Sequence, residues 1–175
     1  MDSPSKLDQW ISEESAMRAR LGPVGVSTRE QLRERSGIDF LSGIGRGETP
    51  VPPIGELMGF IPIEAEPGRV VFQGTPGPQH YNPLGTVHGG YAATLLDSCV
   101  GCAVHSMLPA GKGYTTLELK VNFIRALTST VGPVRAEGKV VTVGGQIGIA
   151  EGRLTDANGK LYAFATTTCL IFTIP

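Results

Sequence analysis

The chain has little cysteine and no long hydrophobic run. Its three cysteines cannot form a complete disulfide framework, which favours a reducing compartment. No stretch approaches the roughly 20 consecutive apolar residues that a transmembrane helix needs. The N-terminal MDSPSKLDQW has no apolar run and carries an acid early, unlike a secretory signal. These absences predict a cytoplasmic protein that is not attached to a membrane.

An excess of charge of either sign is also lacking. Fifteen Lys and Arg residues face sixteen Asp and Glu residues, so the formal net charge is -1. Such a balance excludes a general affinity for nucleic acid or anionic membranes. The 175 residues, 41% of them hydrophobic, are enough for one domain with a core of its own. We therefore expect neither nucleic acid nor a membrane among the partners.

Several signatures of other enzymes are missing. No G-x-S-x-G is present, so the nucleophile elbow of an α/β-hydrolase is not indicated. The glycines at 43, 45 and 47 follow no predicted strand and indicate a turn, not a dinucleotide loop. Cys99, Cys102 and His105 stand three apart on a predicted helix, where they climb about 9 Å and cannot converge on one ion. We predict core cysteines and no metal.

The chain divides at about residue 50. Residues 1–50 are charged and contain two short helical patterns, LDQWISEESAMRARLG and STREQLRERSG, then a brief third helix and a Pro-rich lead-in. We expect an N-terminal helical extension that packs on a larger body, and residues 51–175 form that body.

The body has a simple order of predicted elements. Two strands in FIPIEAEPGRVVFQGTP are followed by one long helix from residue 88 to about 108 and by four more strands. Tight turns such as Asn158-Gly159 make the sheet antiparallel. The first strand after the helix, YTTLELKVNFI, alternates strictly and places on one face Leu117, Leu119, Val121 and Phe123. The predicted class is α+β, with an antiparallel sheet covering one long central helix.

The stretch YNPLGTVHGGYAATLLDS, residues 81–98, carries the clearest chemistry. Gly89 and Gly90 are poor helix formers at a helix start, where amide N–H groups lack partners and the dipole is positive. A carbonyl oxygen could approach them closely, as in an oxyanion hole; a tight loop-to-helix junction is the alternative. Asp97, with the small Ala93 and Gly101 one turn on either side, is a candidate general base or nucleophile, or else an Asp with no catalytic role.

Gly89 and Asp97 are too far apart to act together within one helix. Eight residues at 1.5 Å each separate them by about 12 Å, whereas an acyl carbon and its attacking water need both within a few ångströms. Two copies of the helix running antiparallel across a two-fold axis solve this, with Gly89 of one protomer beside Asp97 of the partner subunit. The sequence therefore predicts an obligate homodimer with two equivalent sites, and leaves a tetramer open.

The pattern N-P-x-G-x-x-H-G-G, followed by Asp97, resembles the PaaI-type branch of the hotdog-fold acyl-CoA thioesterases. The resemblance continues through GYTTLELKVNFIRAL and covers about residues 50–173, but not residues 1–35. It implies the hotdog fold, in which an antiparallel sheet wraps around the central helix. It also implies hydrolysis of an aromatic or aliphatic acyl-CoA to free acid and CoA. The coenzyme A thioester is then the substrate, and no cofactor is expected.

The resemblance also implies roles for single residues. The backbone N–H of Gly89 polarises the thioester carbonyl, helped by the Asn82 side chain, and Asp97 of the partner subunit activates water or attacks directly. His88 fixes the loop. A Ser or Thr at the start of the following strand orients the carboxylate. Thr115 and Thr116 both compete for that part, and we prefer the second because alternation places it on one face with the polar residues Glu118, Lys120 and Asn122.

Binding of coenzyme A is expected to use the Gly90 amide and two cations, Arg125 and Lys120. A different class of function remains in competition, a non-catalytic acyl-CoA sensor on the same fold, because hotdog domains can follow a DNA-binding helical segment. The short N-terminal region, the lack of a basic face and the presence of Asp97 argue against it. A hydratase or dehydratase would need a different signature.

Overall fold

The computed structural model describes residues 4–175, so the first three residues of the predicted N-terminal extension lie outside it. The helices are α1 (Lys6–Arg18), α2 (Arg29–Glu34), α3 (Gly37–Gly45), α4 (Pro53–Met58) and α5 (Gly89–His105), with short 3-10 turns η1 (Pro78–His80) and η2 (Ser129–Val131). The strands are β1 (Phe60–Glu66), β2 (Arg69–Gly74), β3 (Lys112–Phe123), β4 (Val134–Val143), β5 (Ile147–Asp156) and β6 (Leu161–Thr173). The predicted order of two strands, one long helix and four strands is confirmed.

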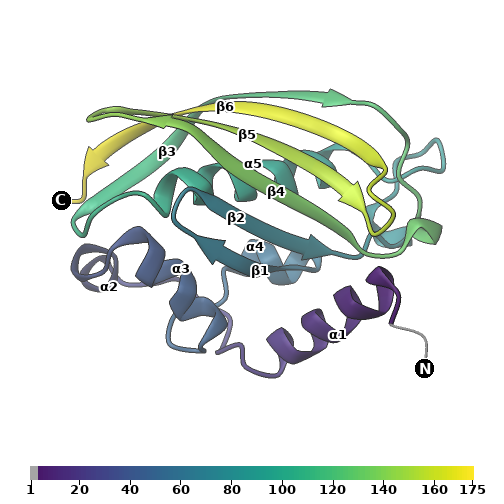
Figure 1. The fold of residues 1–175 in the computed structure, drawn as a ribbon, viewed down its shortest axis with the longest axis horizontal. Coiled ribbons are helices and arrows are strands. Elements are labelled where there is room, and N and C mark those ends of the chain that lie inside the picture. The colour runs from purple at the N-terminus through teal and green to yellow at the C-terminus, as the bar shows by residue number, and fades with distance from the viewer. Residues whose placement is uncertain (1–3) are drawn as a thin grey trace.

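The strands form one antiparallel sheet in the order β1-β2-β4-β5-β6-β3. Figure 1 shows the curved sheet lying over α5, which contacts every strand. Gly159 makes the predicted hairpin turn between β5 and β6 with a φ of 79°. The α+β class and the sheet wrapped around one central helix are therefore confirmed. One edge of the sheet, strand β3, carries the residue that contacts Asp97.

α5 lies close to the sheet because the strand residues that face it are small. A Cβ at Gly138 would overlap the carbonyl oxygen of Cys99, and a Cβ at Gly152 would lie 2.7 Å from Cγ1 of Val100. At both positions the added Cβ would lie closer to α5 than van der Waals contact allows. Only a residue without a side chain fits where the helix backbone crosses β4.

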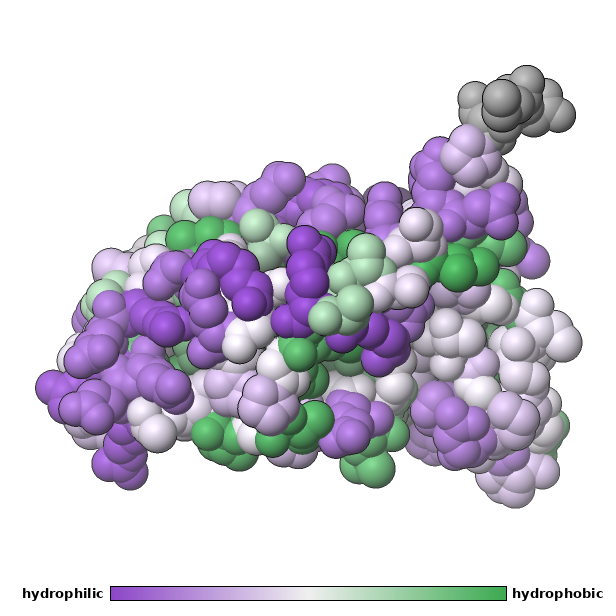
Figure 2. Space-filling model, turned by 90° about the horizontal axis from the view of Figure 1, so that it is seen from below, coloured by the Kyte–Doolittle hydropathy of each residue, from purple (hydrophilic) through white to green (hydrophobic). Residues whose placement is uncertain are grey.

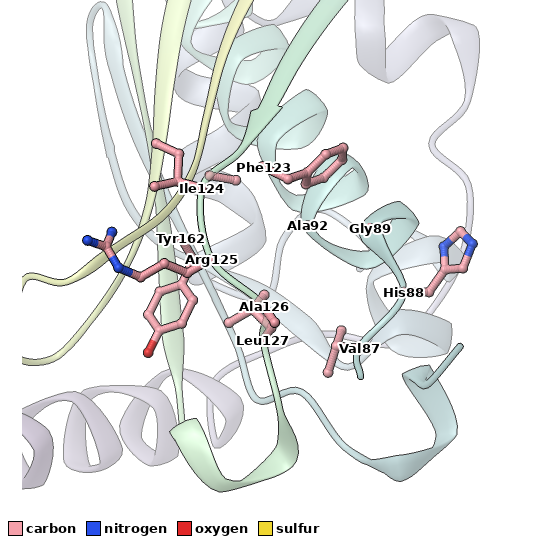
Figure 3. Close-up of a pocket in the computed structure, with 11 residues that line it drawn as sticks. Val87, His88, Gly89, Ala92, Phe123, Ile124, Arg125, Ala126, Leu127 and Tyr162 are labelled. Carbon is pink, nitrogen blue, oxygen red and sulfur yellow. The ribbon is translucent and has the colours of Figure 1, made fainter. Parts of the chain in front are cut away.

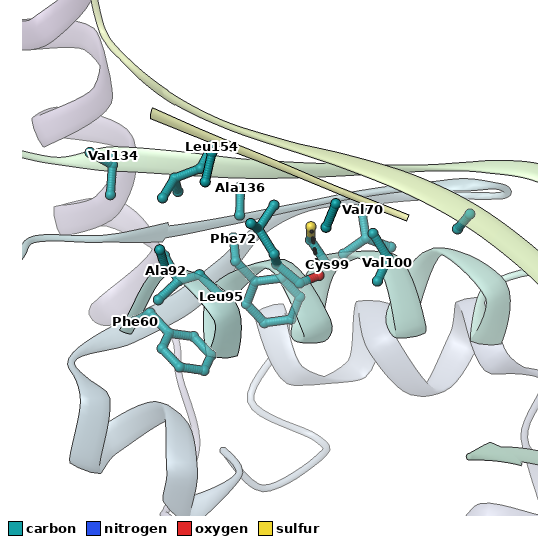
Figure 4. Packing of buried hydrophobic residues seen from close by; sticks show 14 of the residues in the cluster. Phe60, Val70, Phe72, Ala92, Leu95, Cys99, Val100, Val134, Ala136 and Leu154 are labelled. Carbon is teal, nitrogen blue, oxygen red and sulfur yellow. Dashed lines mark hydrogen bonds between the residues drawn. The ribbon is translucent and has the colours of Figure 1, made fainter. Parts of the chain in front are cut away.

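Larger apolar side chains fill the space beside this contact (Figure 4). Leu95 and Val100 of α5 are fully buried, and the rings of Phe60 and Phe72 meet edge to face at 5.7 Å between centroids. Burying each such side chain stabilises the fold by about 1.5–3 kcal/mol. The core therefore fixes α5 along its whole length.

The cysteines of the helix belong to this core. Cys99 and Cys169 are buried and Cys102 is half-buried, and all three are free thiols. His105 is buried as well. Within residues 4–175, no group of three or more His, Cys, Asp or Glu side chains is arranged to hold a metal ion. Cys99 and His105 therefore lie in the interior of the fold, and Cys102 packs against the core.

Burial of His105 predicts acid sensitivity of the fold. Its ring lies 5.6 Å from the ring of Phe40 and 5.4 Å from that of Tyr114, and this burial lowers its pKa to about 4 from an ordinary 6.5. Between these values the unfolded chain binds a proton that the folded chain does not. The free energy of unfolding should therefore fall by up to about 3 kcal/mol as the pH drops from 6.5 to 4.

The measurement is urea unfolding at several pH values, with His105→Leu beside the wild type. In His105→Leu, the free energy of unfolding should depend less steeply on pH, by the contribution of one proton. Equal slopes in the two proteins would show that His105 does not cause the acid sensitivity.

Helices α1 and α3 pack beside β1, and α3 also contacts α5. Trp10 is the buried residue of α1, and the guanidinium of Arg135 lies 4.4 Å from its ring centroid. The buried Gln73 donates to the Trp10 carbonyl (3.1 Å) and to Glu14 (2.7 Å), and accepts from Arg135 (2.7 Å). These polar contacts hold α1 against strands β2 and β4. The division of the chain at residue 50 stays a prediction.

Seen from the side of the N-terminal helices, the surface is mostly hydrophilic with separate small apolar areas (Figure 2). Within residues 4–175, no helix combines the length and the apolar character that crossing a membrane requires.

The alternation predicted for β3 is wrong in its middle. The pairing of β3 with β6 shifts by one residue between Thr116 and Glu118, which is a β-bulge at Leu117. Leu117 is 58% exposed, whereas Leu119 and Val121 pack against the core. Because the bulge inserts one residue, Thr116 shares the inner face with Leu119 and not with the polar residues that follow it.

Candidate active site

The loop that leads into α5 is a small hairpin. Tyr81 and Val87 form an antiparallel bridge, and the Asn82 N–H donates to the Thr86 carbonyl (2.8 Å). Oδ1 of Asn82 accepts from the N–H groups of Leu84 (2.9 Å) and Thr86 (3.3 Å), and its Nδ2 donates to Thr86 Oγ1 (3.0 Å). The Asn82 side chain thus holds the hairpin, and one Nδ2 hydrogen remains for another acceptor.

His88 caps α5 and leaves one amide free. Its Nδ1 accepts from the Gly90 N–H (2.8 Å), and its carbonyl accepts from the Tyr91 N–H (3.0 Å). Among the hydrogen bonds of residues 4–175, none uses the Gly89 N–H. Gly89 therefore offers a single unpaired donor at the positive end of a 17-residue helix. A carbonyl oxygen or an oxyanion is the kind of group that such a donor binds.

A pocket of about 370 Å³ opens beside this amide (Figure 3). The Phe123 ring lies over Gly89, where an added Cβ would be 3.1 Å from its Cζ. Apolar side chains, among them Ala92 and Leu127, line most of the rest. Arg125 lies at the rim, with its guanidinium pointing away from Gly89 in Figure 3 and donating to the Leu161 carbonyl (2.6 Å). The pocket combines an apolar wall, one free N–H and a nearby cation.

Asp97 lies half-buried on α5 and accepts a hydrogen bond of 3.0 Å from Thr116 Oγ1 of β3. Thr115, the competing threonine, is exposed and lies next to Thr116 on the opposite face of the strand. Burial raises the pKa of the nearby Cys102 thiol to about 12, so this thiol stays protonated at neutral pH and is a poor nucleophile. Asp97 is therefore the candidate nucleophile or base on this stretch of α5.

Gly89 and Asp97 lie on the same open side of α5, together with the half-exposed Gly90 and Ala93. Their separation of eight residues corresponds to about 12 Å along the axis. One chain therefore carries the donor and the carboxylate on the same helix, but too far apart for both to act on one substrate atom.

Comparison with known proteins places this site in a family. The thioesterase superfamily matches residues 84–163, the segment that contains α5 and β3. A protein of Saccharolobus solfataricus P2, provisionally named an esterase, is 33% identical over 103 residues, which are 59% of this chain and 71% of that protein. The chain belongs to the thioesterase superfamily. A second protein provisionally named an esterase, from Halobacterium salinarum, is 42% identical over 69 residues, which are 38% of this chain but only 44% of that protein.

A solved structure carries the same fold as this thioesterase. The phenylacetic acid degradation-related protein of Ralstonia eutropha JMP134, provisionally named a thioesterase, is 28% identical with a TM-score of 0.68 and covers 75% of this chain and 98% of its own. The resemblance to PaaI-like hotdog thioesterases is confirmed, as are the hotdog fold and the enzyme class, a thioester hydrolase.

The thioesterase brings some of the predicted site residues together and leaves others apart. Gly89 and Arg125 line one pocket. The Gly90 N–H is already occupied by His88. Lys120 is exposed and alternates with the inward-packed Val121, so it lies on the outer face of β3 and does not line that pocket.

Two contacts of the thioesterase site were not predicted from the sequence. One is the Phe123 ring over Gly89, and the other joins the Tyr81 hydroxyl to Ser129 (3.0 Å to Oγ). Both join segments far apart in the chain, so local sequence patterns give no signal for them. The strand alternation did place Phe123 on a face with other apolar residues, but not beside Gly89.

Proposed function

We propose that this thioesterase hydrolyses acyl-CoA thioesters, with aromatic or aliphatic acyl groups, at a site shared by the two subunits of a homodimer. The Gly89 N–H of one protomer polarises the thioester carbonyl, and Asp97 of the partner subunit acts on the carbonyl carbon or on water. The observation that carries the proposal is the unpaired N–H of Gly89, a residue that lines an apolar pocket and lies on the helix that also carries Asp97.

The reaction needs few groups, because a thioester is already activated. Asp97 of the partner subunit takes a proton from water while the water oxygen bonds to the carbonyl carbon, or its carboxylate attacks that carbon itself. Negative charge moves to the carbonyl oxygen, where the Gly89 N–H and the helix dipole stabilise it. The C–S bond then breaks, and the CoA thiolate leaves and takes up the proton that Asp97 removed from water. Where the carboxylate itself attacked, water then hydrolyses the acyl–Asp97 anhydride, which releases the free acid, restores the carboxylate and supplies the proton for the thiolate. Thr116 holds the carboxylate through its 3.0 Å hydrogen bond.

Coenzyme A is proposed as the thiol carrier because a cation stands at the pocket rim. Arg125 is exposed there, and a guanidinium suits a phosphate group. Its side chain would have to turn from the Leu161 carbonyl toward the ligand. The exposed Lys120 on the outer face of β3 is a more distant second cation.

The free edge of β3 supports the dimer. β3 ends the sheet order, so the backbone groups on its outer side have no strand partner within residues 4–175. Leu117 and Phe123 expose 58% and 57% of their surface along this strand. Native proteins rarely leave a long edge strand with apolar side chains uncovered. Pairing of two β3 strands would cover the edge and bring the two α5 helices together.

A heterodimer tests whether one site takes groups from both subunits. Gly89→Pro removes the N–H, and Pro suits this first helical position because the preceding His88 is extended, with ψ of 137°. Each homodimer, of Gly89→Pro or of Asp97→Asn, should be nearly inactive toward acyl-CoA. A doubly tagged heterodimer of the two should regain about half of the wild-type rate, because one of its two sites is intact.

Gly89→Ala is the matched control, because it adds a side chain against Phe123 but keeps the N–H. It should be at least about tenfold more active than Gly89→Pro. A heterodimer as inactive as the two homodimers would mean that both groups act from the same chain.

A further inference from the structure

Tyr81 connects the two walls of the pocket. Its backbone opens the hairpin that ends at His88, through the bridge to Val87. Its hydroxyl accepts a hydrogen bond of 2.9 Å from the Ser129 N–H and lies 3.0 Å from Ser129 Oγ. Hydrogen bonding to the side chain and to the backbone of Ser129 lowers the pKa of Tyr81. Ser129 begins η2, in the connection from β3 to β4.

The same connection forms the pocket wall opposite Gly89. Residues 124–127 line the pocket on that side, and Val87–Gly89 line it on the other. A backbone bond from the Val87 N–H to the Leu127 carbonyl (3.0 Å) joins the two walls at one point. The Tyr81 hydroxyl joins them at a second point, at the start of the hairpin. Because of this second attachment, the hairpin cannot rotate about the hydrogen bond between Val87 and Leu127.

The hairpin decides where the free amide points. The His88 N–H donates to the His80 carbonyl (2.7 Å), and His88 in turn fixes the first turn of α5 through Gly90. A shift of the hairpin therefore moves the Gly89 N–H relative to Phe123 and the opposite wall. Misplacement of a catalytic group by about 1 Å is enough to slow a reaction about 100-fold.

We propose that Tyr81 is a positioning residue of this thioesterase. Its hydroxyl ties the hairpin to η2 and so keeps the Gly89 N–H at a fixed position beside the pocket that receives the thioester. The inference rests on the proposed function. It concerns how the Gly89 donor is held and adds no group to the chemistry. Because the backbone N–H of Ser129 also donates to this hydroxyl, loss of the Ser129 side chain leaves one of the two bonds in place.

The test compares Tyr81→Phe with Ser129→Ala. Tyr81→Phe keeps the ring and loses the hydroxyl, so kcat toward an acyl-CoA should fall about tenfold while KM stays within about twofold. Ser129→Ala keeps the N–H that donates to Tyr81 and should stay within about twofold of the wild type in both constants. Thermal unfolding of all three proteins checks that stability does not cause the difference.

Hydrogen exchange gives a readout that does not need activity. The amides of Asn82, Val87 and His88 should exchange faster in Tyr81→Phe than in Ser129→Ala or the wild type. Wild-type kcat and wild-type exchange in Tyr81→Phe would overturn the inference, as would equal losses in both variants. If the wild type itself released no thiol from acyl-CoA, the proposed function would fail, while the exchange data would still decide whether Tyr81 holds the hairpin.

Discussion

Replacement of Asp97 by Asn is expected to lower kcat for acyl-CoA hydrolysis by about 10²–10⁴-fold, the usual contribution of a general base, and by more if the carboxylate is the nucleophile. Asn has nearly the same shape and still accepts the hydrogen bond from Thr116, which measures 3.0 Å in the native chain. KM should change little, because the role proposed for the carboxylate is at the reacting carbon or water and not in substrate binding. Thiol release from acyl-CoA, followed with a thiol-reactive dye, measures both constants.

Glu118→Gln is the matched control for this variant. Glu118 is an exposed carboxylate on the strand that carries Thr116, and it lies outside the pocket. It should keep nearly the full wild-type rate. An Asp97→Asn enzyme with more than about a tenth of the wild-type kcat would contradict the assigned role, since loss of a general base is larger than that.

Replacement of Gly138 by Ala should destabilise the fold by about 3 kcal/mol or more. The added methyl group would overlap the Cys99 carbonyl of α5, which is backbone and cannot turn aside as a flexible side chain can. Helix and sheet would have to separate, and the buried side chains packed between them would lose contacts. Urea unfolding followed by circular dichroism gives the free energy of unfolding for variant and wild type.

Gly145→Ala, in the turn between β4 and β5, serves as the comparison. No atom lies within 4 Å of the position of its added Cβ, and its φ is not positive. Its stability should stay within about 0.5 kcal/mol of the wild type. A Gly138→Ala protein as stable as Gly145→Ala would show that α5 can move away from β4 at little cost.

Local patterns in the sequence predicted most of the fold. The spacing of apolar residues located α5, and turn residues such as Asn158-Gly159 located the hairpins, because both signals depend on neighbouring residues. The β-bulge at Leu117 escaped prediction because it arises from pairing with β6, a distant strand. The preference for Thr116 over Thr115 agrees with the bond to Asp97. Thr116 does not share a face with its polar neighbours as predicted, because the bulge at Leu117 lies between them.

The candidate site was predictable only in part. The glycines at a helix start and the carboxylate two turns later could be read from residues 81–98, and their separation follows from helix geometry. The hydrogen bonds of the Asn82 side chain within its own hairpin could not be read, because they depend on the path of the backbone from Asn82 to Thr86. The contact of Phe123 with Gly89 depends on where the end of β3 meets the start of α5, which only packing decides.

The strand order β1-β2-β4-β5-β6-β3 implies that some strand pairs form faster than others. β1 with β2, and β4 with β5 and β6, are neighbours in the chain and can pair through short turns. Pairing of β2 with β4 must close a loop that contains the whole of α5 and β3. Closing such a loop costs chain entropy before any contact compensates for it, which slows folding. We therefore expect β1-β2 and β4-β5-β6 to form before these two parts join, and α5 contacts the strands of both.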